Sequence, residues 1–234
     1  MKGAQKGARM EKRYSRNIAA VSPEDMKQLR RSRVFVAGCG GLGGYIIEYL
    51  ARMGIGAITA ADGAVFSESD LNRQIFSNVY NLGMNKALAA GHRIREINPG
   101  VSIRAIPEFL TKENASRLMA DADLVMDALD SVSARHILED AAAEARLPII
   151  HGSVSGWNLR TMLVLPGSGR LRQLYPESRP AAPKTYLPFT PAACAAFQAS
   201  IAVRHLCGHT SDKDYELFTG SLMDLSFESV HIGN

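Results

Sequence analysis

Two cations and several polar side chains near the middle of the sequence could handle phosphate. An acid, an amide, a cation and a second amide occur within five residues, at Asp70, Asn72, Arg73 and Gln74. Lys86 follows thirteen residues after Arg73 and opens a predicted helix. Arginine and lysine neutralise phosphate oxygens and the charge that develops during displacement at phosphorus. The pair therefore indicates a triphosphate, since a nicotinamide cofactor needs neither cation here, although this segment alone also fits a solvated polar loop.

A glycine-rich turn upstream could cradle those phosphates. The apolar run 34–37 leads into glycines at the G-x-G-x-x-G spacing, and apolar residues then recur at helical spacing to Met53; the turn comprises Gly38, Cys39, Gly40, Gly41, Leu42 and Gly43. Without a Cβ the backbone lets an anion approach the amides at the helix start, where the helix dipole is positive. The spacing predicts a nucleotide seat over residues 38–44. A tight turn without a ligand has the same pattern, and the motif does not specify the nucleotide.

Carboxylates end two of the predicted strands. Asp62 follows the run 57–61, about twenty residues past the glycine turn, where an acid can accept the ribose hydroxyls; a helix cap or a loop acid is the alternative. Asp127 and Asp130 follow the short run 124–126. Carboxylates beside a triphosphate hold Mg²⁺, and Asp130 fits this role better because it lies past the strand end. Capping of the helix that begins at Ser133 is the alternative for both.

The elements that must position these side chains alternate along the chain. Strands are predicted at 34–37, 57–61, 101–106, 124–126 and 148–151, and helices at 23–31, 42–53, 85–97, 111–119 and 133–145. This order predicts an α/β, Rossmann-like, doubly wound and mostly parallel sheet with helices on both faces. Ligands bind such sheets beyond the carboxyl ends of the strands. The glycine turn, Asp62, residues 127–130 and His151 all fall at those ends.

The predicted alternation of strands and helices ends after residue 152. A strand is predicted at 157–165, followed by a crossing loop over 166–189 that contains five prolines. Thr190 and Pro191 begin a helix that Gly208 ends. The runs 222–225 and 227–232 are candidate strands that would extend the sheet in antiparallel fashion. We predict a disordered basic tail over 1–12 and one nucleotide-binding domain over 13–234.

Composition and charge narrow the class of protein. The 234 residues, 46% apolar, include no run of 18 uncharged apolar residues, so we expect no membrane span, and the polar N-terminus favours a cytoplasmic protein. Three cysteines without a C-x-x-C pair, Cys39, Cys194 and Cys207, are expected to be reduced thiols. Residues 1–33 hold ten basic and three acidic residues, against 17 and 20 in the remainder. The basic segment could bind nucleic acid or supply cations to a phosphate site, and nucleic acid is the less expected partner.

The motifs together resemble the ThiF/MoeB/HesA family, bacterial relatives of the ubiquitin-activating enzymes. The resemblance is carried by Arg16 in Arg-Tyr-Ser-Arg-Asn, the glycine turn, Asp62, the segment 69–74, Lys86 and residues 127–130, and it covers residues 13–165 strongly and 190–207 loosely. It implies an adenylyltransferase that uses ATP and Mg²⁺. In such enzymes a ubiquitin-like sulfur-carrier protein, similar to ThiS or MoaD, presents a C-terminal Gly-Gly carboxylate that attacks the α-phosphate. Pyrophosphate leaves and an acyl-adenylate forms.

The resemblance also implies roles for individual residues. Asp62 would hold the ribose, Arg73 and Lys86 the phosphates, and Asp130 the Mg²⁺. Arg16 would enter the active site of the partner subunit in a homodimer. The remaining residues expected to contact the nucleotide are Gly38, Gly40, Gly41, Leu42, Gly43, Asp70, Asn72, Gln74 and Leu129.

Three features depart from the family pattern. Asp70 stands where the family usually has asparagine, and a carboxylate there would repel phosphate unless Arg73 or a metal intervenes. The C-x-x-C zinc ligands of many relatives are missing, so no structural zinc is expected. The crossing loop contains no cysteine, and Cys194 lies in a predicted helix where a core position is favoured. The reaction is therefore expected to stop at the adenylate, with sulfur supplied by a separate donor.

Three alternative functions fit parts of the sequence. A tRNA threonylcarbamoyladenosine dehydratase-like enzyme would share the glycine turn and the Asn-Arg-Gln segment, and the basic arm favours it, whereas Arg16 does not. An NAD-dependent oxidoreductase would use the glycine turn and Asp62 but would leave Arg73, Lys86 and Asp130 without a role. A non-catalytic binding subunit is supported only by Asp70.

Overall fold

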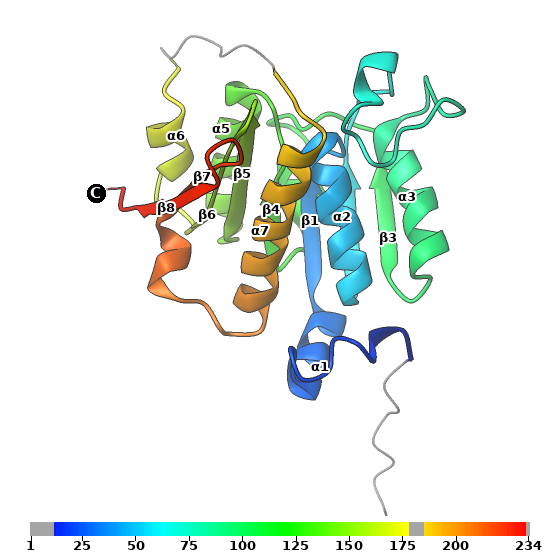
Figure 1. Cartoon of the computed structure of the whole chain (residues 1–234), viewed down its shortest axis with the longest axis horizontal. Coiled ribbons are helices and arrows are strands. Elements are labelled where there is room, and N and C mark those ends of the chain that lie inside the picture. The colour runs from blue at the N-terminus through cyan, green and yellow to red at the C-terminus, as the bar shows by residue number, and fades with distance from the viewer. Residues whose placement is uncertain (1–11, 178–184, 233–234) are drawn as a thin grey trace, which may run out of the picture.

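The fold is an eight-stranded mixed sheet with helices on both faces (Figure 1). The computed structural model describes residues 12–177 and 185–232. The strand order is β3-β2-β1-β4-β5-β6-β7-β8. The first five strands in sequence are parallel, and they are β1 (Arg33–Ala37), β2 (Ala57–Ala61), β3 (Ser102–Ile106), β4 (Leu124–Asp127) and β5 (Ile149–Ser155). The antiparallel extension is β6 (Asn158–Val164), β7 (Leu217–Ser221) and β8 (Ser226–Val230). The predicted fold class is confirmed.

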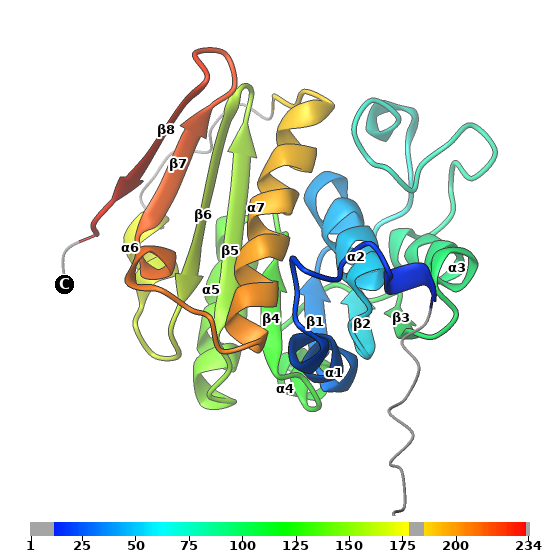
Figure 2. The ribbon, with the colours of Figure 1, turned by 60° about the horizontal axis from the view of Figure 1, so that its bottom comes forward.

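Helices cover the two faces of the sheet (Figure 2). One face carries α2 (Gly41–Met53), α3 (Lys86–Ile97) and α7 (Phe189–Leu206), and the other carries α4 (Ala115–Met119), α5 (Val132–Glu144) and α6 (Arg170–Leu174). Each face has its own apolar core, the first built around Ile46, Leu50 and Ile94 and the second around Phe35, Leu118 and Leu138. None of the helices in the described ranges is both long and apolar enough to cross a membrane.

The helix α1 (Pro23–Arg31) lies at the end of the sheet where β1 begins. It starts as predicted: Ser22 accepts a hydrogen bond from the amide of Asp25, whose side chain accepts one from the amide of Ser22, and Pro23 occupies the first helical position. A 3-10 turn, Lys12–Tyr14, precedes it and buries Tyr14, whose ring lies where a Cβ on Gly54 would be. Residues 12–31 are therefore held at the end of the molecule opposite the glycine turn.

The C-terminal half differs from the prediction in three places. The loop over 166–189 contains the helix α6, because both carboxylate oxygens of the buried Glu139 accept hydrogen bonds from the amides of Leu171 and Arg172. The predicted strand 222–225 is instead the turn between β7 and β8. The strand β7 occupies Leu217–Ser221, where none was predicted, and the predicted strand 227–232 corresponds to β8, Ser226–Val230. The helix α7 begins at Phe189 rather than at Thr190. Residues 178–184 of the loop, and 1–11 of the predicted disordered tail, lie outside the described residues.

Candidate nucleotide site

The glycine turn between β1 and α2 is compact and leaves backbone amides available. Gly38 has a φ of +96°, and a Cβ on Gly43 would lie 1.9 Å from the Gly38 carbonyl oxygen. The amides of Gly38 and Cys39 donate to Ala61 and Asp62. No side chain caps α2, and within the described residues the amides of Gly40, Gly41 and Leu42 have no acceptor. The turn therefore presents unpaired donors at a helix N-terminus, which is the arrangement that binds phosphate.

The close approach inside this turn gives a prediction for stability. Gly43→Ala is expected to lower the free energy of unfolding by about 3 kcal/mol or more, because the added methyl group has no space beside the Gly38 carbonyl. Urea titration followed by circular dichroism measures the change. Gly40→Ala is the matched control, since a Cβ there would lie 3.7 Å from its nearest neighbour. Equal stability of the two variants would contradict the packing described here.

Arg73 and Lys86 both lie beside this turn. A Cβ on Gly41 would lie 3.3 Å from Cγ of Arg73, so the arginine side chain packs directly over the turn. Lys86 is the first residue of α3, whose N-cap, Asn85, accepts a hydrogen bond from Leu88 and donates two to the backbone after β2. Nζ of Lys86 lies 3.4 Å from Oδ2 of Asp70, whose Oδ1 lies 3.5 Å from Nη2 of Arg73. The two cations predicted to hold phosphates are therefore brought together at the glycine turn.

The segment 67–74 holds the arginine in place. Asp70 caps the 3-10 turn Glu68–Asp70 by accepting hydrogen bonds from the amide and hydroxyl of Ser67. The Gln74 amide nitrogen donates to Asp70 over 2.5 Å, and Gln74 packs against Gly40, while its Oε1 is buried without a partner among the described residues. Arg73 donates to the carbonyl of Ser69 and to the side chain of Asn72. A local network therefore sets the direction of the guanidinium.

Tyr186 completes the surroundings of Arg73 and was not anticipated. The guanidinium lies 4.3 Å from the centre of the Tyr186 ring, and Asn72 donates to the Tyr186 carbonyl. Thr185 accepts a hydrogen bond from the amide of Gly156 in the turn between β5 and β6. The chain just before α7 thus spans from that turn to Arg73. No signal in the sequence identifies Tyr186, because its contact depends on the path of the chain.

Asp62 is located where the prediction puts it but already has partners. Its two carboxylate oxygens accept hydrogen bonds from the amides of Cys39 and Ala64, each over 2.8 Å. The side chain therefore braces the glycine turn against the end of β2. An ionised carboxylate has further lone pairs, so these bonds are compatible with the predicted contact to ribose hydroxyls.

Asp127, the last residue of β4, and Asp130, in the loop after it, lie in different environments. Asp127 is completely buried, whereas Asp130 is exposed. The loop that carries Leu129 and Asp130 abuts the glycine turn, since a Cβ on Gly38 would lie 2.7 Å from the Ala128 carbonyl oxygen. The described residues contain no group of three or more His, Cys, Asp or Glu that could hold a metal ion. An exposed carboxylate beside the turn fits Mg²⁺, which binds through one or two carboxylates together with phosphate oxygens and water.

A buried polar network supports that loop, and most of its contacts were not predicted from the sequence. The Asp127 carboxylate lies 2.7 Å from Nδ1 of His151 and 3.1 Å from Nε of Arg135, and it accepts a hydrogen bond from the Leu129 amide. Arg135 also donates to the Leu129 carbonyl and stacks on the ring of Tyr175 at 4.6 Å. A buried arginine on the inner face of α5 follows from helical spacing once Asp127 is known to be inside. No pattern in the sequence predicts that Tyr175 joins this network.

The charge states within this network follow from its geometry. Burial opposes ionisation of Asp127, but Arg135 and His151 outweigh it and hold the pKa of the carboxyl below its ordinary value. Burial lowers the pKa of His151. The ring is thus neutral, with the Nδ1 proton donated to Asp127. The Tyr175 hydroxyl lies 3.1 Å from Nε2 of His151 and 2.8 Å from the Ser153 hydroxyl.

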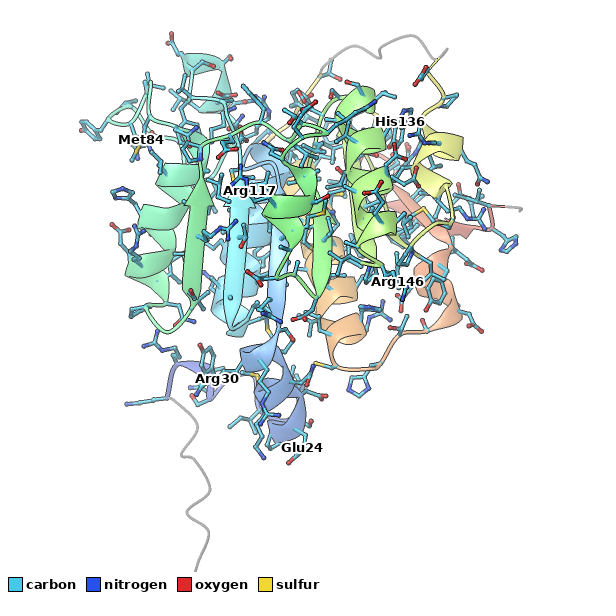
Figure 3. The ribbon with its side chains drawn as sticks, turned by 180° about the vertical axis from the view of Figure 1, so that it is seen from behind. Glu24, Arg30, Met84, Arg117, His136 and Arg146 are labelled. Atoms are coloured by element: carbon cyan, nitrogen blue, oxygen red, sulfur yellow. The ribbon has the colours of Figure 1, made fainter. Side chains whose placement is uncertain are left out.

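Arg16 does not reach the site of its own subunit. It is exposed and follows the 3-10 turn that packs on Gly54, at the C-terminal end of α2, while the glycine turn lies at the opposite end of that 13-residue helix. A helix of this length spans roughly 20 Å. Figure 3 shows the same separation, with Glu24 and Arg30 of α1 at one end and Met84 and His136 toward the other.

Comparison with known proteins identifies the class. The ThiF family model matches residues 14–234, and the chain belongs to the ThiF family. It is 32% identical over 226 residues to the SAMP-activating enzyme E1 of Haloferax volcanii, covering 93% of this chain and 84% of that protein. It is 35% identical over 160 residues to the sulfur carrier protein ThiS adenylyltransferase of Bacillus subtilis, covering 67% of this chain and 48% of that protein. The chain is an enzyme of the nucleotidyltransferase class.

The fold comparison agrees with the family. The crystal structure of E. coli MccB superposes with a TM-score of 0.80 at 18% identity, covering 97% of this chain and 71% of that chain. PaaA superposes with a TM-score of 0.77 at 20% identity, covering 89% of this chain and 66% of that chain. At these identities the likeness concerns the fold alone. The chain spans about half the length of the ThiS adenylyltransferase.

Proposed function

We propose that this protein uses ATP and Mg²⁺ to adenylylate the C-terminal Gly-Gly carboxylate of a ubiquitin-like sulfur-carrier protein, with release of pyrophosphate. The observation that carries the proposal is that the amides of Gly40 and Gly41 have no acceptor among the described residues, while Arg73 packs over the same turn and Lys86 lies beside Arg73 across Asp70. Relatives named as adenylyltransferases of sulfur carriers support the carrier as substrate.

Each of the proposed residues has a separate role in the displacement at phosphorus. A carboxylate is a weak nucleophile and is repelled by phosphate, so positioning and charge neutralisation must supply most of the rate. Arg73 and Lys86 would neutralise the phosphates, Asp62 would orient the ribose, and Asp130 would hold Mg²⁺. The metal would supply further neutralisation of the pyrophosphate that leaves. The attacking oxygen comes from the carrier, so the enzyme needs no nucleophile of its own.

The cysteines support a reaction that ends at the adenylate. Cys194 is fully buried in α7 with its thiol against the carbonyls of Ser153 and Arg160, and burial raises its pKa to about 12. Burial also raises the pKa of Cys207 to about 11 and keeps the Cys39 thiol protonated. A thiolate is the form that attacks an acyl-adenylate. We therefore expect a separate donor to supply sulfur.

We also propose a homodimer in which Arg16 acts in the partner's site. A shallow hollow of about 340 Å³ is lined by Asn17, the residue after Arg16, and by side chains of α2 and α7 that include Tyr49, Met53 and Val203. Arg16 makes no hydrogen bond or ion pair with any described residue, so its guanidinium is available to a second subunit.

Mixing two inactive variants tests this arrangement. In a mixture of Arg16→Ala and Lys86→Ala subunits, one site of each mixed dimer contains both native residues, so about a quarter of the wild-type sites should be active. The readout is adenylate formation after subunit exchange has been verified with two affinity tags. A mixture as inactive as its parents would contradict action across the dimer.

The function itself is tested by the product. The protein, ATP and Mg²⁺ are incubated with carriers that end in Gly-Gly, and intact-mass spectrometry detects the carrier with AMP attached. The matched control is the same carrier without its last two residues, which should remain unmodified. Absence of adenylate on every carrier tested, with folded enzyme that binds ATP, would contradict the proposal.

A further inference from the structure

Asp70 differs from the other acids of the site because its carboxylate lies between the two proposed phosphate-binding cations. Oδ1 is 3.5 Å from Nη2 of Arg73, and Oδ2 is 3.4 Å from Nζ of Lys86. All three side chains are largely shielded from water, with exposed fractions of 9%, 17% and 12%. Each cation is therefore already partly neutralised, and the three groups together carry one positive charge instead of two.

The carboxylate is also fixed in position. Oδ2 accepts hydrogen bonds from the amide and the hydroxyl of Ser67, and Oδ1 accepts one from Gln74. Burial opposes ionisation, but the bond from the Ser67 amide and the charge of Lys86 outweigh it and hold the pKa of the Asp70 carboxyl below its ordinary value. The group is therefore ionised at neutral pH, and it cannot turn away without breaking the cap of the Glu68–Asp70 turn.

We propose that Asp70 makes the site select the magnesium complex of a nucleoside triphosphate over the free polyphosphate, an inference that rests on the function proposed above. Phosphates that reach Arg73 and Lys86 also come close to the Asp70 carboxylate, and charges at such distances interact strongly where water is partly excluded. A triphosphate without Mg²⁺ keeps its full negative charge, so the Asp70 carboxylate repels it strongly. Mg²⁺ removes much of that charge, so the magnesium complex is penalised less.

The substitution Asp70→Asn tests the proposal because it removes the charge and keeps the size and one acceptor oxygen. Isothermal titration calorimetry gives the affinities for ATP and for AMP, each in Mg²⁺ and in EDTA. We expect the variant to bind free ATP about tenfold more tightly than the unmodified protein does, with a smaller change for the magnesium complex. The affinity for AMP, which lacks the β- and γ-phosphates, should not change.

Glu68→Gln is the matched control, because Glu68 is exposed in the same 3-10 turn and its charge is not between the cations. It should leave the preference for the magnesium complex unchanged. If Asp70→Asn fails to fold, as judged by its melting temperature, Asp70→Ser carries the same prediction. The unmodified protein must itself prefer the magnesium complex, so equal affinities in Mg²⁺ and EDTA would overturn the proposal without any variant.

The outcomes separate this inference from the function on which it rests. An unchanged preference in the folded Asn variant overturns the role of Asp70, even if carriers are adenylylated. A reduced preference together with no adenylate on any carrier leaves the role of Asp70 standing and overturns the carrier function. No binding of ATP by the unmodified protein in either buffer overturns both.

Discussion

Replacing Arg73 or Lys86 with alanine should reduce adenylate formation by about a thousandfold while the protein stays folded. Removal of a single fixed donor to developing charge costs roughly 10²–10³ in rate, and removal of a cation at a transferring phosphoryl group costs more. Both side chains are largely shielded from water beside the glycine turn, where such interactions are strong. The rate is measured in a single turnover, with ATP saturating and the enzyme in excess of the carrier.

A matched control separates this effect from a general loss of positive charge. Lys27 lies on α1, with 69% of its side chain exposed, at the end of the molecule opposite the glycine turn. Lys27→Ala should retain the wild-type rate, and circular dichroism should show the same fold for all three variants. Near wild-type rates in Arg73→Ala and Lys86→Ala would mean that the cations beside the turn do not act on the phosphates.

Replacing Asp127 with asparagine should lower the free energy of unfolding at pH 7 by about 3–5 kcal/mol. The substitution leaves the guanidinium of Arg135 buried without its counter-charge, and breaking a buried ion pair from one side costs about this much. Asparagine also keeps only one of the two acceptor oxygens, so its NH2 group must face either the Leu129 amide or the donors of His151 and Arg135. Urea titration measures the change. Asp140→Asn, which removes an exposed partner of Arg172, should have no measurable effect and serves as the control.

The loss of unfolding free energy in Asp127→Asn should depend on pH, and the direction follows from the pKa of Asp127. The pKa of Asp127 is lower in the folded protein than its ordinary value of 3.8. The ionised carboxylate therefore stabilises the fold above the ordinary pKa, and this contribution is lost as the pH falls through the folded value. The difference between Asp127→Asn and the unmodified protein should accordingly shrink below about pH 4. A difference that grows on acidification would contradict the ionised state assigned to Asp127.

The parts of the site that the sequence predicts are those set by local chemistry. The glycine turn, Asp62 and Lys86 each follow from a strand end or a helix start, so their spacing along the chain determines where they lie. Asp130 follows in the same way from the end of β4. Their roles toward nucleotide and metal remain predictions, because geometry alone does not assign them.

The parts that could not be predicted depend on contacts between distant segments. Tyr175, which follows α6, contacts His151, and Tyr186, just before α7, contacts Arg73, although the partners are 24 and 113 positions apart in the sequence. The contrast between Asp127 and Asp130 depends on Arg135, which neutralises the buried acid from α5. The run 222–225, apolar except for Asp224, predicts a strand, yet a tight turn forms there in which the Ser221 hydroxyl accepts a hydrogen bond from the amide of Asp224.

Carrier-dependent exchange of labelled pyrophosphate into ATP tests the central claim most directly, because it reports reversible displacement at the α-phosphorus by a protein carboxylate. Unmodified enzyme with Mg²⁺ and a Gly-Gly-ended carrier should incorporate label into ATP, and the incorporation should stop when the carrier lacks its last two residues. Folded enzyme that binds ATP but exchanges no label with any such carrier, or that exchanges label equally well without one, would contradict the account.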